Sequence, residues 1–343
     1  MRRTNFLVIV LGLLLCSSGL ATQNNPLSDG TIVEQTPCPN PGGSYDKYVE
    51  SFERRQKMEV EAAKREGFQI EILKNLSQGV LSRDEFQRRT AYAEFECHRI
   101  AYLSDGLKVA GFLWKPQDTA GKKFPLIIFN RGGNREFGKL SPWASFGFYT
   151  YVSSGFVVVG SQYRGNDGGE GREEFGGADV RDVLHLIPLA RALGYVDMQN
   201  VFVLGWSRGG MMTYLALKHD IPVNAVAVGG GLTDLVSEGK RRPGLVKEWR
   251  ALIPDFDTRR EELLRERSAV YWADRINVPV LILQGSADWR SDATTQARGL
   301  AQRLAELGKK HELVIYPGDD HGLTLNRADS ESRIIEWFKK HTK

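Results

Sequence analysis

Residues 201–217 read Val201-Phe-Val-Leu-Gly-Trp-Ser207-Arg-Gly-Gly-Met-Met-Thr-Tyr-Leu-Ala-Leu217. An apolar run with strand propensity enters a Gly-x-Ser-x-Gly turn, and a helix-forming run leaves it. This context is typical of a nucleophile elbow, in which small residues let the backbone bend sharply and lift a serine hydroxyl clear of a sheet. The chain holds 36 glycines in 343 residues, so the pentapeptide alone is weakly specific. The flanking strand and helix make it informative, and they predict Ser207 as a catalytic nucleophile.

A nucleophilic serine needs a base to take its proton and a third group to orient that base. Two later apolar runs read as strands, and each ends in a loop that offers a candidate. Residues 278–284 lead into Gly285-Ser-Ala-Asp288, and residues 311–316 lead into Pro317-Gly-Asp-Asp-His321. Open parallel sheets place their ligands at the carboxyl ends of strands. We therefore predict Asp288 as the acid and His321 as the base.

Other acids and histidines compete for these roles. Asp292 falls at a predicted helix start, where its charge complements the helix dipole. Asp319 and Asp320 share the loop of the histidine, which makes a contact to its far ring nitrogen harder. The remaining histidines are interpreted as surface or packed residues: His98, His185, His219, His311 and His341.

The reaction also needs hydrogen-bond donors for a developing oxyanion. One should be the backbone N–H of Arg208, directly after the nucleophile. The second should come from the loop Asn130-Arg-Gly-Gly-Asn134, where Gly132 and Gly133 let the main chain approach a substrate carbonyl. The alternative is a tight turn without a role in binding.

The rest of the chain alternates strands and helices after an opening hairpin, which predicts a mostly parallel, eight-stranded sheet with helices on both faces. The order Ser, Asp, His along the chain is that of the α/β-hydrolase arrangement, so we predict an α/β-hydrolase fold. Strands are expected near 96–103, 107–114, 125–130, 156–160, 201–204, 224–228, 279–284 and 312–316. Helices are expected to start near Asp179, Arg208, Ser291 and Arg327.

With these residues in place, the chain resembles the prolyl oligopeptidase family of serine peptidases, in a form without the β-propeller of that family. The resemblance covers roughly residues 100 to 340 and implies the triad roles for Ser207, Asp288 and His321. Besides the elbow it is carried by Gly111-Phe-Leu-Trp-Lys-Pro116, Gln162-Tyr-Arg-Gly165, Gly176-Gly-Ala-Asp-Val180, Val278-Pro-Val280, Gly285-Ser-Ala-Asp288 and Asp320-His-Gly322.

One position departs from the family. Members often carry a tyrosine or histidine where this chain has Arg131, whose fixed charge and longer reach would change the oxyanion site. Arg131 is also one of four arginines expected near the carboxyl edge of the sheet, with Arg164, Arg208 and Arg290. Such a cluster would favour substrates that carry a carboxylate near the scissile bond. The alternative is that each arginine pairs with a nearby acid and holds a loop.

The N-terminal part divides into three segments. Residues 1–21 combine two arginines, a short apolar run and small residues, which predicts a signal peptide cleaved near Ala21. The run is too short to span a membrane, and Leu15 before Cys16 makes a lipoprotein less favoured. Residues 22–95 read as an extended lead-in followed by charged helices, and residues 96–343 as the catalytic domain. Residues 232–276 form a charged helical insertion that either roofs the site or is a solvated helical pair.

Net charge and cysteine content bear on which ligands the protein could bind and on the compartment in which it folds. The net charge of +4 falls close to zero once Arg2 and Arg3 leave with the signal, which gives no indication of nucleic-acid binding. Cys38 and Cys97 are then the remaining cysteines, and they either pair in an oxidising compartment or stay as free thiols. The adjacent residues Asp319, Asp320 and His321 lack metal-ligand spacing, so no metal or cofactor is expected.

The leading hypothesis is a secreted or periplasmic serine peptidase that acts through Ser207, Asp288, His321 and an acyl-enzyme on a small peptide. An esterase acting on small acyl esters would use the same residues. A non-catalytic binding protein on this fold is the alternative of another class, although such proteins usually lose a member of the triad.

Overall fold

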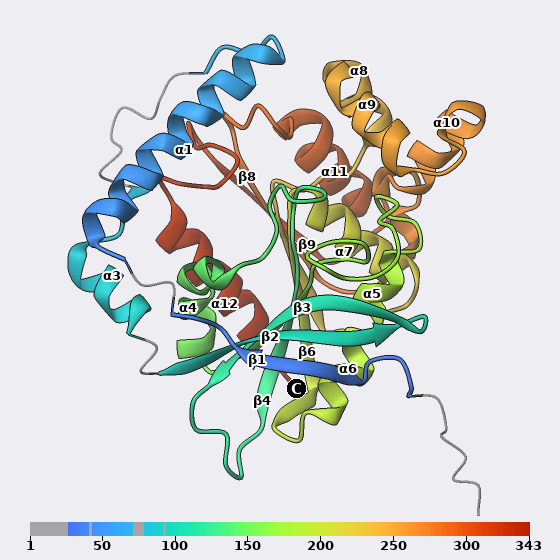
Figure 1. Ribbon diagram of the computed structural model, residues 1–343. Coiled ribbons are helices and arrows are strands. Elements are labelled where there is room, and N and C mark those ends of the chain that lie inside the picture. Colours follow the sequence, from blue (N-terminus) through green and yellow to red (C-terminus); the bar gives the residue numbers. More distant parts are fainter. Residues whose placement is uncertain (1–26, 41–42, 71–78, 92–93) are drawn as a thin grey trace, which may run out of the picture.

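The computed structural model describes residues 27–40, 43–70, 79–91 and 94–343 (Figure 1). The predicted signal peptide, with Cys16, lies outside the described residues. Within the described residues, one sheet has the strand order β1-β2-β3-β5-β4-β6-β7-β8-β9. Its strands are β1 Ile32–Pro37, β2 Phe95–Ser104, β3 Leu107–Pro116, β4 Phe124–Asn130, β5 Val157–Ser161, β6 Val196–Trp206, β7 Ala225–Gly229, β8 Val280–Gly285 and β9 His311–Tyr316.

All eight predicted strands are present, and the sheet holds a ninth. The prediction missed β1 because its sequence, Ile-Val-Glu-Gln-Thr-Pro, is short and mostly polar. β1 lies at the sheet edge, antiparallel to β2, and four of its six residues are exposed. An edge strand of this kind adds backbone hydrogen bonds without an apolar face, so it lacks the alternation that marks a half-buried strand.

The direction of the strands determines where the site can lie. β2 and β3 form the predicted antiparallel hairpin, and β3 pairs antiparallel to β5. From β5 through β9 every neighbouring pair is parallel. The loops that follow these parallel strands therefore meet at one edge, and the loops carrying Ser207, Asp288 and His321 are among them.

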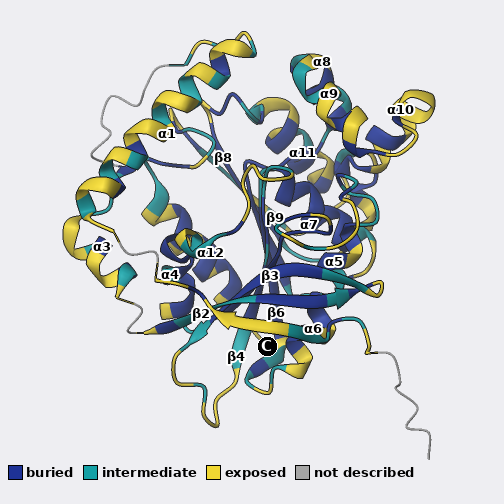
Figure 2. Cartoon of the chain, viewed as in Figure 1, coloured by how far each residue is buried: buried dark blue, intermediate teal, exposed yellow. Residues whose placement is uncertain are grey.

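Helices cover both faces of the sheet, and each face has its own core of buried apolar side chains. The α4 and α12 helices pack on one face, and α5, α6, α7 and α11 on the other. Figure 2 shows α7 and the inner strands of the sheet as largely buried, whereas β1, α1 and α10 expose much of their surface. The helices are α1 Tyr45–Arg65, α3 Arg83–Thr90, α4 Ser145–Ser153, α5 Val180–Leu184, α6 Leu186–Ala192, α7 Arg208–Lys218, α8 Leu235–Arg241, α9 Pro243–Leu252, α10 Phe256–Glu266, α11 Gly299–Glu306 and α12 Arg327–Lys340.

The N-terminal segment is fastened to the catalytic part at several points. A disulfide joins Cys38, just after β1, to Cys97 in β2, with a Cα–Cα distance of 5.2 Å. Aromatic rings of Tyr48 in α1, Phe86 in α3 and Phe146 in α4 form a small separate core. Of the two alternatives for Cys38 and Cys97, a disulfide or free thiols, the structure has the disulfide.

The charged insertion contains three helices, α8, α9 and α10, where the sequence suggested a helical pair as one alternative. Trp249 of α9 is fully buried, and Arg242 donates to the carbonyl of Arg290 at 2.9 Å. The insertion is therefore packed against the loop that carries Asp288. In the part of the chain described, no helix is both long and apolar enough to cross a bilayer.

Candidate active site

Ser207 lies at a sharp turn between β6 and α7. Its backbone has φ 58° and ψ −124°, a strained conformation for a non-glycine residue. The two flanking glycines, Gly205 and Gly209, are required because neither position has room for a side chain. A Cβ on Gly205 would lie 2.4 Å from the carbonyl oxygen of Gly209, and one on Gly209 would lie 1.8 Å from that of Asn130. The Gly-x-Ser-x-Gly sequence is thus the one that lets this turn form against β4.

Asp288 and His321 meet at the carboxyl ends of β8 and β9. The Oδ2 atom of Asp288 lies 2.7 Å from Nδ1 of His321. The Asp288 side chain is fully buried, while that of His321 is 17% exposed. Asp288 also accepts hydrogen bonds from the side chain of Gln284 at 2.8 Å and from the backbone N–H of Arg290 at 2.8 Å and Ser291 at 3.0 Å. Its carboxylate is therefore held in one orientation with its lone pairs satisfied.

The backbone of His321 also contacts the turn that carries Ser207. Trp206, the residue before the serine, donates its indole N–H to the carbonyl of His321 at 2.9 Å. The backbone N–H of Ser207 donates to Gly229 at 2.9 Å, and a Cβ on the next residue, Gly230, would lie 2.9 Å from the ring of His321. The serine and the histidine thus lie beside the same short segment, Gly229–Gly230.

The competing acids are engaged elsewhere. Asp292 caps the π-helical turn Ala293–Arg298, accepting from the backbone N–H of Thr295 at 2.7 Å, as expected for a helix-start charge. Asp319 accepts from the backbone of Leu325 and Asn326 at 3.0 Å each, and Asp320 accepts from Thr324. These two carboxylates shape the loop that carries His321.

The glycine-rich loop after β4 approaches the serine with its backbone. A Cβ on Gly132 would lie 2.9 Å from Cβ of Ser207 and 3.6 Å from its Oγ, and Gly133 has φ 68°. The side chain of Arg131, in contrast, is buried and bonded to backbone carbonyls. It is 1% exposed, and its guanidinium donates to the carbonyls of Gln162, Gly132, Phe137 and Arg135. Burial lowers the pKa of this guanidinium.

Two of the arginines predicted near the carboxyl edge of the sheet are buried and paired with acids of the fold. Arg164 is 5% exposed and bonded to Asp182 and Asp105, and Arg208 is 2% exposed and bonded to Glu173 and Asp179. Burial opposes the charge of Arg164, but the hydrogen bonds and charges of Asp182 and Asp105 together outweigh it and raise the pKa of this guanidinium. A buried guanidinium must be neutralised, so these side chains hold loops, as the alternative stated.

Arg290 is held by a residue that the sequence did not point to. Glu59 of α1 accepts from Arg290 Nε at 2.6 Å, from its second nitrogen at 2.7 Å and from the indole of Trp289 at 2.7 Å. Burial opposes ionisation, but these hydrogen bonds and the charge of Arg290 outweigh it and lower the pKa of Glu59. This contact, which we name the Glu59 clamp, fixes α1 to the loop of Asp288. Glu59 is one of many charged residues in α1, so no pattern in the sequence distinguished it from the others.

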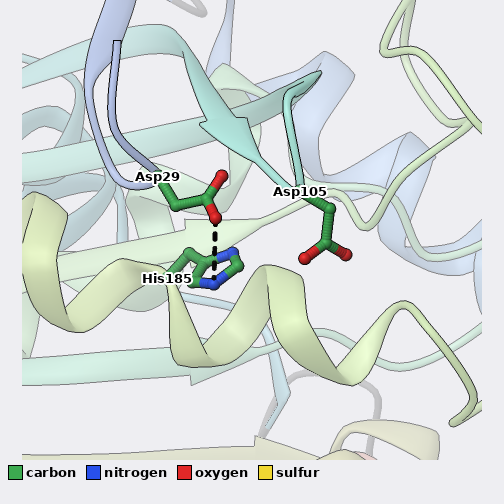
Figure 3. Close-up of side chains that lie close together, drawn as sticks. All are labelled: Asp29, Asp105 and His185. Atoms are coloured by element: carbon green, nitrogen blue, oxygen red, sulfur yellow. Dashed lines mark ion pairs between the residues drawn. The ribbon is translucent and has the colours of Figure 1, made fainter. Parts of the chain in front are cut away.

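Three potential metal ligands also lie together, away from the residues above. Figure 3 shows Asp29 and Asp105 beside His185, with atoms that lie within 4.8 Å of one another. Asp105, however, already pairs with Arg164 and Arg181, and their charges lower its pKa against the effect of burial. His185 lies 3.5 Å from Asp29. These three residues therefore have a structural explanation: they join the segment before β1 to the catalytic part of the chain.

The family model described as the prolyl oligopeptidase family matches residues 142–343. The chain belongs to the prolyl oligopeptidase family. It is a hydrolase of the serine peptidase type on the α/β-hydrolase fold. The described residues contain one sheet and no β-propeller.

The similar proteins match different shares of this chain and of their own length. The uncharacterized peptidase YtmA of Bacillus subtilis (strain 168) is 29% identical over 225 residues, which are 65% of this chain and 85% of that protein. Acylamino-acid-releasing enzyme 1 of Oryza sativa subsp. japonica is 28% identical over 267 residues, 70% of this chain and 33% of that protein. The structure of Pyrococcus horikoshii acylaminoacyl peptidase superposes with a TM-score of 0.63 at 23% identity, over 77% of this chain and 44% of the other. This chain therefore spans about a third of the rice enzyme that it matches.

Proposed function

We propose that this prolyl oligopeptidase family member hydrolyses small peptides through a triad of Ser207, His321 and Asp288. The observation that carries the proposal is the contact of 2.7 Å between Asp288 and His321 beside the strained turn of Ser207. Asp288 would keep Nδ1 of the imidazole protonated, which leaves Nε2 free to act as the base.

The steps follow from these positions. Ser207 Oγ attacks the scissile carbonyl and passes its proton to His321. The oxyanion would be stabilised by the N–H of Arg208, which at the start of α7 has no partner within the helix, and by an N–H from the Gly132–Gly133 loop. The imidazolium then gives its proton to the leaving amine, and water hydrolyses the acyl-enzyme by the reverse path. The side chains of Arg131 and Arg164 take no part in this scheme.

Activity measurements test the triad. Wild-type protein should hydrolyse aminoacyl or dipeptidyl anilides and react with a fluorophosphonate probe. Ser207→Ala should abolish labelling, and Asp288→Asn should lower kcat/KM by about 10⁴-fold. Asp292→Asn is the matched control, because this acid caps a helical turn, and it should stay near wild type. An unlabelled wild-type protein, or an Asp292 effect as large as that of Asp288, would refute the proposal.

The same assay separates peptide from ester substrates. The esterase alternative uses the same residues, so a panel that includes nitrophenyl esters is compared by kcat/KM. Ester hydrolysis without any cleavage of anilides or peptides would favour the alternative.

We also propose that the chain is exported, with residues 96–343 as its catalytic domain and residues 22–95 preceding it. The apolar segment of residues 1–21 and the disulfide between Cys38 and Cys97 support this, since disulfides persist in oxidising compartments. Mass spectrometry of protein secreted by an expression host should give an N-terminus near residue 22. An uncleaved protein retained in the cytoplasm would contradict export.

A further inference from the structure

A cavity of about 690 Å³ lies between α1, α4 and α12, next to the candidate active site. Trp206 and Gly322 line it, and these residues directly adjoin Ser207 and His321 in the chain. Its size is in the range of pockets that bind small organic ligands. The walls come from α1 on one side and from α4, the start of α12 and the ends of β4 and β6 on the other.

Most of the lining is apolar or aromatic. The aromatic lining residues include Trp143, which is 46% exposed and stacks on Phe146 at 5.3 Å between ring centroids. An exposed ring beside a hollow with apolar walls marks a place where apolar ligand groups can leave water. The apolar and aromatic lining residues are Tyr48, Leu81, Phe129, Leu140, Trp143, Ala144, Phe146, Phe148, Tyr151, Leu204 and Trp206.

The charged lining is strongly one-sided. Four cations face one acid, Glu331, which is already engaged by the hydroxyl of Thr150 at 2.7 Å and lies 3.7 Å from Arg89. Within the described residues, none of the four cations has a carboxylate within 4.0 Å: Lys47, Arg54, Arg55 and Arg327. Nearby arginines of α3 behave differently, since Arg83 pairs with Asp46 and Arg88 with Glu85.

Two of these cations, Arg55 and Arg327, line the same cavity and carry like charges. Partial burial and then the like charge of Arg327 lower the pKa of Arg55. Like charges gathered beside an apolar hollow destabilise the unliganded protein, and an anionic group would relieve that repulsion. The pair of guanidinium groups offers planar donors suited to a carboxylate.

The position of the cavity relative to the histidine indicates which part of a substrate would enter it. In acyl transfer the imidazolium must reach the leaving group to protonate it. Gly322, next to His321, lines the cavity, whereas the oxyanion loop and Arg208 do not. Building on the proposed function, we propose that the cavity binds the leaving-group half of a peptide substrate. Its apolar side chain would lie on the aromatic wall, and its C-terminal carboxylate would bind Arg55 and Arg327.

Matched peptides that differ only at their C-terminus test this proposal. One ends in a free carboxylate and the other in a carboxamide, both with apolar residues after the scissile bond, and the cleavage products are separated by chromatography. Wild-type kcat/KM should favour the carboxylate by about tenfold or more. In the double variant Arg55→Gln with Arg327→Gln this ratio should fall to about one. Lys57→Gln, on the same helix but outside the cavity lining, should keep it.

Equal kcat/KM for the two peptides in the wild type, or a preference that survives in the double variant, would overturn the assignment while the hydrolase proposal stood. A binding measurement covers the case in which no peptide is cleaved. In the Ser207→Ala protein, calorimetry should detect 4-phenylbutyrate but not 4-phenylbutyramide, and the double variant should lose this binding. Equal binding of the two probes, or binding of neither, would likewise overturn the assignment.

Discussion

Two groups of arginines lie near the candidate active site, and they differ in what surrounds the guanidinium. Arg131, Arg164 and Arg208 are at most 5% exposed, and acids or carbonyls accept their hydrogen bonds. Arg55 and Arg327 line a cavity without a carboxylate partner among the described residues. A buried charge must be neutralised by the fold itself, so it is not available to a ligand. Whether an arginine can bind a ligand therefore depends more on whether an acid of the fold already pairs with it than on its position near a predicted strand end.

The comparison of paired with unpaired arginines predicts that Arg208→Met causes the largest loss of stability. This change leaves Glu173 and Asp179 as buried carboxylates without their main cation, which should cost about 3–5 kcal/mol of unfolding free energy. Urea unfolding followed by circular dichroism measures it. Arg54→Met, at the cavity, is the control and should change stability by less than about 0.5 kcal/mol. Similar losses for both variants would remove the distinction between the groups.

A second prediction concerns the loop in which a buried arginine adjoins the serine. The structure assigns the backbone of this loop, rather than the Arg131 side chain, to the approach toward the nucleophile. Gly132→Ala places a Cβ 2.9 Å from that of Ser207, which should displace the loop and lower kcat/KM by about 10²–10³-fold. Gly194→Ala, between α6 and β6 and outside the cavity lining, is the control, since a Cβ there meets nothing within 4 Å. Near-normal activity of Gly132→Ala would show that the loop is not part of the site.

Much of this arrangement could be predicted from the sequence. Strand periodicity and the flanking residues gave all eight strands of the hydrolase core. The order of the triad candidates predicted Asp288 and His321 in the loops after two late strands. These strands, β8 and β9, are neighbours in the sheet, and the two side chains form a hydrogen bond of 2.7 Å. These features depend on local patterns and on the fixed geometry of parallel sheets, so a single chain is enough to read them.

The features that were missed depend on long-range pairing. Which acid neutralises Arg164 is decided by contacts with Asp105 and Asp182, 59 and 18 residues away. The Glu59 clamp joins residues 231 positions apart. Neither has a periodic signal, because one charged residue among many on a helix looks like its neighbours until the fold supplies its partner.

The Glu59 clamp gives a prediction with a defined pH dependence. Glu59→Gln removes the charge that holds Arg290, which should cost about 1–2 kcal/mol of unfolding free energy at neutral pH. The pKa of Glu59 is lowered in the folded state from its usual 4.5. The contribution is therefore complete above that value and is lost as the pH falls through the lowered pKa.

Unfolding of the wild type and the Glu59→Gln variant at pH 7 and at pH 3 tests this dependence. The difference between the two proteins should be smaller at pH 3. Glu53→Gln, an exposed position on the same helix, should show no difference at either pH. A constant gap between wild type and Glu59→Gln across this range would mean that the clamp depends on hydrogen bonding alone and not on charge.

The smallest expected change in stability is that of Arg55→Gln, and it directly distinguishes an arginine that binds a ligand from one that holds the fold together. Among the described residues, Arg55→Gln removes no ion pair, and it relieves the repulsion from Arg327. The free energy of unfolding should therefore stay within about 0.5 kcal/mol of wild type or rise slightly. The rise should shrink in high salt, because added ions already screen the repulsion. Urea unfolding at low and high salt measures both effects, with Lys57→Gln as the variant that changes net charge equally. A loss of more than about 1 kcal/mol would place Arg55 with Arg208, as a residue that the fold itself requires.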